Sequence, residues 1–187
     1  MIKKSISMAL LTIAILFQGC NDNNDNNNKE ANNILSSNEF ILTSTNNTQY
    51  VVKKEAQGFV VENTKGKVII FDIFATWCPP CQASAKHLTS IQKKYKDNVV
   101  VLGITIEDNI ANSKLQEFKE KYGADYTILN SDRNRPLVNE IATALELGER
   151  FPIPIMALYK DGKLITHYVG EVQEEFVESD IKRALGL

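Results

Sequence analysis

The feature that most constrains the fold is a long apolar run that ends in two closely spaced cysteines. Residues 68–75 read Val-Ile-Ile-Phe-Asp-Ile-Phe-Ala, and Cys78 and Cys81 follow directly in Thr-Trp-Cys-Pro-Pro-Cys-Gln. The run is short and rich in β-branched residues, which is typical of a central strand buried on both faces. Apolar residues at helical spacing behind the cysteines predict a helix that continues to Lys96. The cysteines therefore lie where a buried strand gives way to a helix.

The rest of the chain is predicted to form further strands and helices. Strands are predicted at residues 40–43, 50–53, 58–63, 98–106, 126–129, 154–159 and 164–169. Asp161-Gly162, between the last two strands, is a strong hairpin signal. We expect an α/β protein with a central mixed β-sheet flanked by helices and an N-terminal β extension.

Three further helices are predicted from their end signals and apolar spacing. Ser113 and Gln116 match a capping box, and Gly123 suits the end of the helix that follows. Pro136 suits the first turn of the next helix, with Gly148 beyond its end. The last is an amphipathic helix whose apolar residues are Val172, Phe176, Val177, Ile181, Ala184 and Leu185.

The N-terminal part of the chain reads as an export signal and a tether. Residues 1–20 have a positive start, an apolar stretch too short to span a bilayer, and an end at Cys20 that resembles the bacterial lipobox. We expect Cys20 to be lipidated; the alternative is a signal cut by an ordinary peptidase. Residues 21–36 are Asn-rich and too polar to form a core, so they predict a disordered tether before a domain at 37–187.

A cysteine at the start of a helix has a specific chemistry. The N–H groups and the dipole of the helix stabilise a thiolate, which is the reactive form of cysteine. Cys78, at the mouth of the helix, is the predicted exposed nucleophile, and Cys81, one turn inside, is the predicted resolving thiol. The expected redox group is the Cys78–Cys81 disulfide itself, with no other cofactor.

Other uses of two cysteines at this spacing fit less well. A structural zinc site needs four ligands, and the chain has no second cysteine pair and only His87 and His167 to add. Covalent haem attachment needs a histidine after the second cysteine, where this chain has Gln82. A purely structural disulfide remains an alternative in an exported protein. We expect no metal site.

The segment Trp77-Cys78-Pro79-Pro80-Cys81 resembles the thioredoxin superfamily, and in particular its TlpA/ResA-like branch of tethered periplasmic proteins. The likeness extends from about residue 39 to the C-terminus, and it implies a thioredoxin-like fold. It implies a substrate-binding surface formed by Trp77, Ile153 and Pro154, with a cis peptide bond before Pro154. Pro152 competes for that place, but the residues after Pro154 match the family's strand and turn in register.

The resemblance also gives Asp72 a role, six residues before Cys78. In thioredoxins an acid there lies buried under the redox pair and shuttles the proton of the resolving cysteine. Burial in an apolar strand should raise the pKa of this carboxyl toward neutrality. The alternative is an Asp72 that points into solvent. The chain departs from the TlpA/ResA-like branch at Ser84, where that branch commonly has an acid, so the branch's substrate specificity does not carry over directly.

The direction of electron flow depends on the residues between the cysteines. Pro79 and Pro80 both lack a backbone N–H, so two potential donors to the Cys78 thiolate are missing. A poorly stabilised thiolate gives a low reduction potential, which favours a disulfide reductase. The alternatives are a disulfide oxidase or isomerase, and a client-binding module without turnover.

The expected partners follow from the resemblance. They are exported proteins with thiols or disulfides, including apocytochromes c, and a transmembrane thiol-relay protein as electron donor. The expected place is the periplasmic side of a bacterial membrane, held by the lipid on Cys20. A formal net charge of −2 offers no basic stripe, so we expect no nucleic-acid partner.

Overall fold

In the computed structural model, which describes residues 38–187, strand β4 (Val68–Phe74) occupies the centre of the molecule. All seven of its residues are buried. It pairs in parallel with β5 (Val99–Thr105) and antiparallel with β7 (Ile155–Lys160). The predicted buried strand is therefore confirmed. The predicted signal, tether and lipidation site at Cys20 lie outside the described residues.

The central sheet is mixed, as predicted. Its order is β6-β5-β4-β7-β8, where β6 spans Thr127–Leu129 and β8 spans Lys163–Val169. Strands β4, β5 and β6 run parallel, whereas β7 and β8 form an antiparallel hairpin. Asp161 and Gly162 at the hairpin turn have φ angles of 47° and 79°, the left-handed conformation that such a turn requires.

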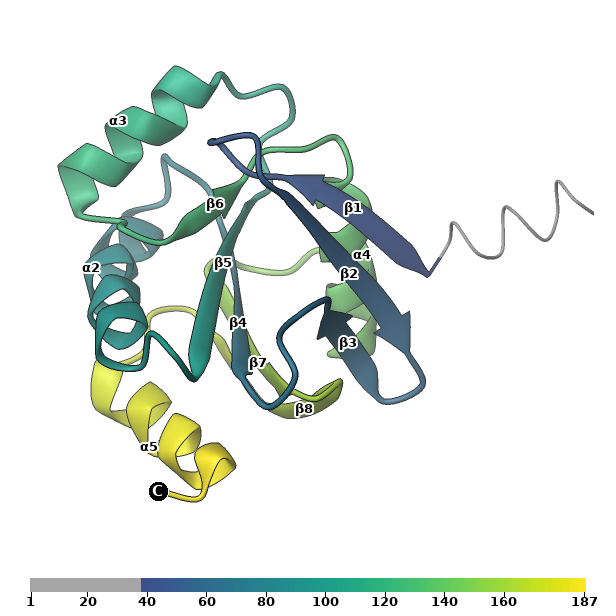
Figure 1. Ribbon diagram of the computed structural model, residues 1–187. Helices are drawn as coiled ribbons and strands as arrows, with labels where there is room; N and C mark the ends of the chain where they lie inside the picture. The colour runs from purple at the N-terminus through teal and green to yellow at the C-terminus, as the bar shows by residue number, and fades with distance from the viewer. Residues whose placement is uncertain (1–37) are drawn as a thin grey trace, which may run out of the picture.

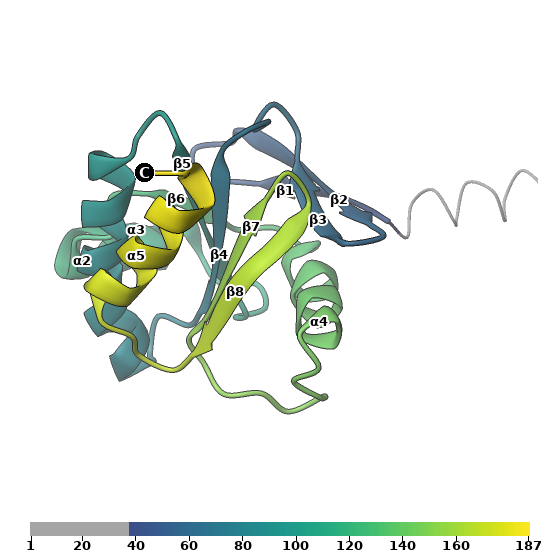
Figure 2. The ribbon, with the colours of Figure 1, turned by 90° about the horizontal axis from the view of Figure 1, so that it is seen from below.

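Two layers cover the central sheet (Figures 1 and 2). One face carries α2 (Pro79–Lys94), α3 (Asn112–Tyr122) and α5 (Glu174–Leu185). The other face carries α4 and the N-terminal β extension, a three-stranded antiparallel sheet. Helix α4 spans Asn134–Ala144. The strands of the extension are β1 (Glu39–Thr43), β2 (Gln49–Glu55) and β3 (Gly58–Val61).

The side chains of β4 alternate between the two cores. Val68, Ile70 and Phe74 pack on the side of α2, whereas Ile69, Phe71 and Ile73 pack on the side of α4. Because side chains in a strand alternate with period two, Asp72 points toward α2. The N-terminal extension is joined to the sheet by edge-to-face contacts of the Phe59 ring with Phe71 and Tyr159, at centroid distances of 6.3 and 5.6 Å.

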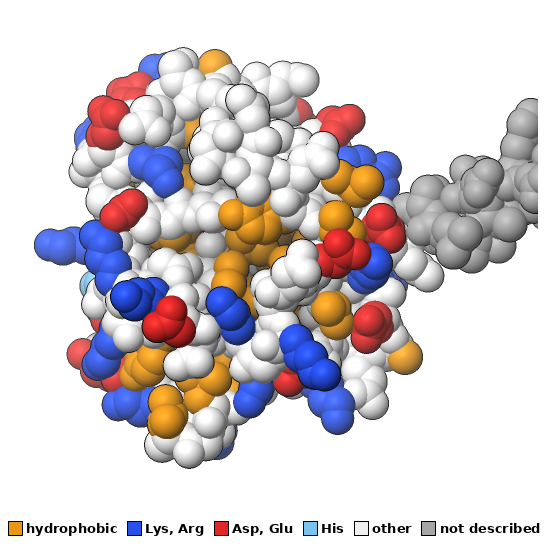
Figure 3. All heavy atoms as spheres, in the orientation of Figure 1, with side chains coloured by type: hydrophobic (Ala, Val, Ile, Leu, Met, Phe, Trp, Pro, Cys, Tyr) orange, Lys and Arg blue, Asp and Glu red, His pale blue; other side chains and the backbone are white. Residues whose placement is uncertain are grey.

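The surface carries charges of both signs. Figure 3 shows Lys and Arg side chains interspersed with Asp and Glu over the face seen in Figure 1, with hydrophobic side chains between them. Among the described residues, no helix is long and apolar enough to cross a membrane.

The helix ends differ from the predictions in three places. The capping box at Ser113 is wrong: α3 begins at Asn112, so Ser113 is already inside the helix, and Gln116 donates to Glu120 instead. Helix α2 ends at Lys94, two residues before the predicted end. Val172 lies before α5, which begins at Glu174. Gly123 does end α3, with a φ of 67°, and Pro136 lies in the first turn of α4.

Candidate active site

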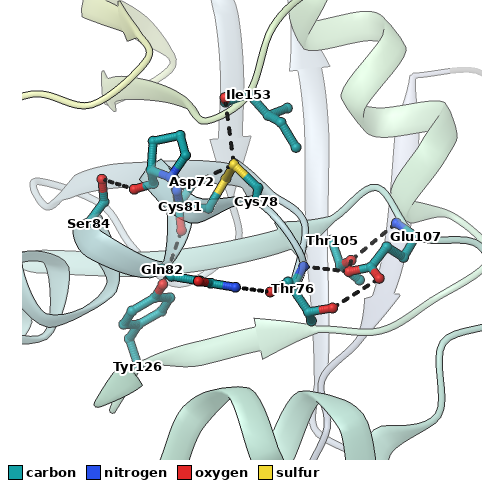
Figure 4. The surroundings of a disulfide bond; sticks show 11 residues. Asp72, Thr76, Cys78, Cys81, Gln82, Ser84, Thr105, Glu107, Tyr126 and Ile153 are labelled. Carbon is teal, nitrogen blue, oxygen red and sulfur yellow. Dashed lines mark hydrogen bonds between the residues drawn. A yellow bond between two sulfur atoms is a disulfide. The ribbon is translucent and has the colours of Figure 1, made fainter. Parts of the chain in front are cut away.

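The two cysteines form a disulfide at the junction of β4 and α2 (Figure 4). Their Cα atoms are 5.2 Å apart. Cys78 is the N-cap residue of α2, and Pro79 and Pro80 occupy the first two helical positions. This is the strand-to-helix junction that the sequence predicts, because proline suits the first turn of a helix, where its missing N–H costs nothing.

The backbone around Cys78 gives its sulfur little support as an anion. The N–H of Cys81 donates to the Cys78 Sγ at 3.4 Å, and it is the first N–H that α2 can offer, since Pro79 and Pro80 have none. On the other side, the carbonyl oxygen of Ile153 lies 3.7 Å from the same sulfur. That oxygen carries a partial negative charge and opposes a thiolate. One donor and one acceptor therefore face the Cys78 sulfur.

Ile153 and Pro154 lie opposite the disulfide, directly before β7 (Figure 4). The peptide bond between them is cis, and the bond before Pro152 is not. The N–H of Gly170 at the end of β8 donates to the Pro154 carbonyl at 2.8 Å, which ties this loop to the sheet edge. The cis bond is at the proline that the sequence predicts. The contact of Ile153 and Pro154 with substrate stays a prediction.

The exposure of the site differs from our expectation. We predicted an exposed Cys78, but only 3% of this residue is accessible in the disulfide form, close to the 2% of Cys81. The Ile153 carbonyl, in the loop before Pro154, lies 3.7 Å from the Cys78 sulfur and covers it on that side. Trp77 beside it is 64% exposed. The assignment of Cys78 as nucleophile stays a prediction that rests on its position at the helix end.

Asp72 is buried at the middle of β4, with 2% of its surface accessible. Burial is the main cause that raises the pKa of its carboxyl to about 7, and a hydrogen bond from Tyr126 acts in the opposite direction. The Tyr126 hydroxyl donates to Asp72 Oδ2 at 3.1 Å, whereas Oδ1 has no partner. Figure 4 shows the carboxyl between Tyr126 and Cys81. A carboxyl with this pKa can take and return a proton near neutral pH.

Gly103 makes the Tyr126 contact possible. It pairs with Asp72 on the neighbouring strand β5. A Cβ atom at this position would lie 3.0 Å from the Tyr126 ring and 3.3 Å from the Phe74 ring. The absence of a side chain at Gly103 therefore leaves the room in which the Tyr126 ring reaches the carboxyl.

Four residues of the site were not predicted from the sequence. Tyr126 contacts Asp72, while Thr76, Gln82 and Glu107 form a hydrogen-bond network beside the disulfide. Glu107 follows the predicted strand at 98–106. A signal for it existed, because the carboxyl ends of neighbouring parallel strands meet at one edge of a sheet. No sequence signal linked Tyr126 to Asp72.

Among residues 38–187, no group of three or more His, Cys, Asp or Glu side chains is arranged to hold a metal ion.

Comparisons with known proteins agree with this geometry. The Redoxin family model matches residues 38–185. The thiol-disulfide oxidoreductase ResA of Bacillus thuringiensis (strain Al Hakam) is 24% identical over 143 residues, which cover 71% of this chain and 78% of the relative.

Two solved structures share the thioredoxin-like fold. One is a thiol:disulfide interchange protein from Chlorobium tepidum TLS, with a TM-score of 0.60 and 21% identity over 79% of this chain and 94% of that one. The other is StoA from Bacillus subtilis, with a TM-score of 0.54 and 15% identity over 76% and 95% of the two chains.

The raised pKa of Asp72 predicts a pH-dependent stability. Between pH 4 and 7 the unfolded chain has lost this proton and the folded chain keeps it, so stability falls as pH rises and levels off above pH 7. The difference between 3.8 and about 7 corresponds to ~4 kcal/mol. We compare the free energy of unfolding of the oxidised protein with that of Asp72→Asn. The difference between the two should fall by about this amount as the pH rises from 4 to above 7.

Urea unfolding of both proteins from pH 4 to 8 measures this difference. Asp132→Asn, which changes an exposed carboxylate, is the matched control and should follow the unmodified protein. If the free energy of unfolding changes with pH in the same way for the unmodified protein and for Asp72→Asn, Asp72 has an ordinary pKa.

Proposed function

Because the chain belongs to the Redoxin family and is a thiol–disulfide oxidoreductase of the TlpA/ResA-like thioredoxin superfamily, we propose that it reduces disulfides of exported proteins. Its substrates are proteins with thiols or disulfides. The observation that carries the proposed direction is the poor support for a Cys78 thiolate. A single N–H, that of Cys81, donates to the sulfur, and the Ile153 carbonyl opposes it.

The support that the Cys78 thiolate receives affects the reduction potential of the disulfide. Stabilising the thiolate stabilises the reduced protein and makes its disulfide a strong oxidant. Cys78 keeps the favourable end of the α2 dipole but loses two N–H groups to Pro79 and Pro80. The reduced form is then less stable relative to the disulfide, so the dithiol gives up its electrons more readily.

The proposed reaction has two steps. The Cys78 thiolate attacks one sulfur of a client disulfide, which forms a mixed disulfide and releases the other client sulfur as a thiolate that takes up a proton. Asp72 then accepts the Cys81 proton, and the Cys81 thiolate attacks the Cys78 sulfur and expels the second client sulfur as a thiolate, which takes up a proton. Two electrons pass from the protein to the client, and the Cys78–Cys81 disulfide is left. A donor dithiol reduces it again.

The site geometry supports these roles. Asp72 points toward α2, the helix that contains Cys81, and both residues are buried, so no bulk water competes for the proton. Ile153 and Pro154 face the Cys78 sulfur, where a client strand would lie, and the exposed Trp77 extends this surface. We propose that the disulfide is the only redox group and that the site uses no metal.

We expect a midpoint potential near the reducing thioredoxin value, ~−270 mV, in titrations with defined dithiothreitol or glutathione buffers. Pro79→His adds an N–H and a cation at the helix end, so its potential should rise by at least about 30 mV, or ~1.4 kcal/mol. Pro136→Ala, in the first turn of α4, is the matched control and should leave the potential unchanged. A value above about −180 mV for the unmodified protein would favour an oxidase or isomerase instead.

The clients can be captured through the resolving step. Cys81→Ala should accumulate mixed disulfides through Cys78, because no second thiol remains to release the client. Mass spectrometry of the trapped complexes identifies the clients, with apocytochromes c and a transmembrane thiol-relay donor as the expected partners. The double variant Cys78→Ala, Cys81→Ala is the control. If Cys81→Ala traps no more protein than the control, the proposed order of attack is wrong.

We also propose that the protein acts on the periplasmic side of a bacterial membrane, anchored by a lipid on Cys20. The lipobox-like end of residues 1–20 supports this location. Cells fed a labelled fatty acid should incorporate it into the protein, and Cys20→Ser should abolish the label. Equal labelling of both would exclude Cys20 as the anchor.

A further inference from the structure

Thr76, in the loop between β4 and α2, has each of its polar groups held by a side chain from another element. Its N–H donates to Glu107 Oε2 at 2.6 Å, and its hydroxyl donates to Glu107 Oε1 at 3.0 Å. The Gln82 side chain, from the first turns of α2, donates to the Thr76 carbonyl at 2.7 Å. Figure 4 shows Thr76 between Gln82 and Glu107, two residues before Cys78. One loop residue is thus held from two directions.

Glu107 is itself tied to the rigid sheet. It lies two residues after the end of β5, and its own N–H donates to the Thr105 hydroxyl at 3.1 Å. The preceding N–H, of Ile106, donates to the Phe74 carbonyl at 3.0 Å, which continues the pairing of β4 with β5. Thr105 is buried, with 1% of its surface accessible. The Glu107 carboxylate is therefore fixed relative to β5, and through it the Thr76 loop is fixed to the sheet.

The loop has few other restraints. The N–H of Cys78 donates to the Ala75 carbonyl at 3.2 Å, and Pro79 and Pro80 offer no N–H that could bind a loop carbonyl. Trp77 projects into solvent from this segment. Without Glu107, the Thr76 N–H and the Thr76 hydroxyl would each lose the hydrogen bond that they donate to its carboxylate. The directions of Trp77 and of the Cys78 sulfur both depend on that backbone.

We propose that Glu107 is a positioning residue for thiol–disulfide exchange, which holds Thr76 and thereby sets the orientation of Trp77 and Cys78 toward the client. In-line attack on a disulfide demands a well-defined sulfur position, so a loose loop slows the exchange. This role serves the oxidoreductase chemistry whichever way the electrons flow. It therefore stands or falls independently of the proposed reductase direction.

The test compares Glu107→Ala with Glu107→Gln in the reduced protein. The rate constant for exchange with a synthetic peptide disulfide, measured by stopped flow in a single turnover, should fall about tenfold in Glu107→Ala. Glu107→Gln keeps an oxygen that can accept from the Thr76 N–H and should recover most of the rate. Trp77 is the only tryptophan of the chain, so its fluorescence anisotropy reports on the loop directly and should fall in Glu107→Ala.

Controls separate positioning from general destabilisation. Asp132→Asn removes an exposed carboxylate that does not bind Thr76, and its rate and anisotropy should be unchanged. Gln82→Leu removes the second restraint on Thr76 and should lower the Trp77 anisotropy and the rate even if Glu107→Ala does not fold. A folded Glu107→Ala with normal rate and anisotropy would overturn the proposal, as would a Glu107→Gln variant as slow as Glu107→Ala.

Discussion

The complete burial of β4 is the constraint on which the rest of the structure depends. Neighbouring strands pair with both of its edges, and a core covers each of its faces, so the end of β4 is held from every side. The redox loop starts at that end, and the helix that carries the cysteines starts after the loop. The same burial keeps water from Asp72. A single strand therefore defines both the position of the disulfide and the protonation behaviour of the acid beneath it.

The proton and electron chemistry of the site have a common physical origin. Both Asp72 and the Cys78 sulfur lie where a negative charge is poorly compensated: the carboxyl has one hydrogen-bond partner, Tyr126, and the sulfur has one N–H donor, that of Cys81. Burial raises the pKa of the carboxyl toward neutrality, and the single hydrogen bond from Tyr126 offsets this only in part, which suits a group that exchanges protons. For the sulfur, weak compensation disfavours the thiolate. Under the proposed reductase direction, the same lack of compensating groups serves both the proton shuttle and the release of electrons from the dithiol.

Much of this arrangement could be predicted from the sequence because it is encoded locally. The apolar run before Cys78 predicted the buried strand, and the residues after Pro154 predicted which proline has the cis bond. Contacts between distant segments were not predicted, although the meeting of parallel strand ends at one sheet edge gave a signal for Glu107. Tyr126 reaches Asp72 across 54 residues, and Glu107 reaches Thr76 across 31. Neither pair leaves a periodic pattern. The low exposure of Cys78 escaped prediction for the same reason, since the Ile153 loop that covers it comes 75 residues later.

The shielding of the disulfide has a consequence for the approach of a partner thiol. Cys78 and Cys81 are almost wholly covered, whereas Trp77 beside them is open to solvent. A sulfur that attacks a disulfide has to approach along the axis of that bond. The Ile153 carbonyl occupies one side of the Cys78 sulfur, so it restricts the directions from which an attacking sulfur, on a small molecule or on a protein, can reach the pair.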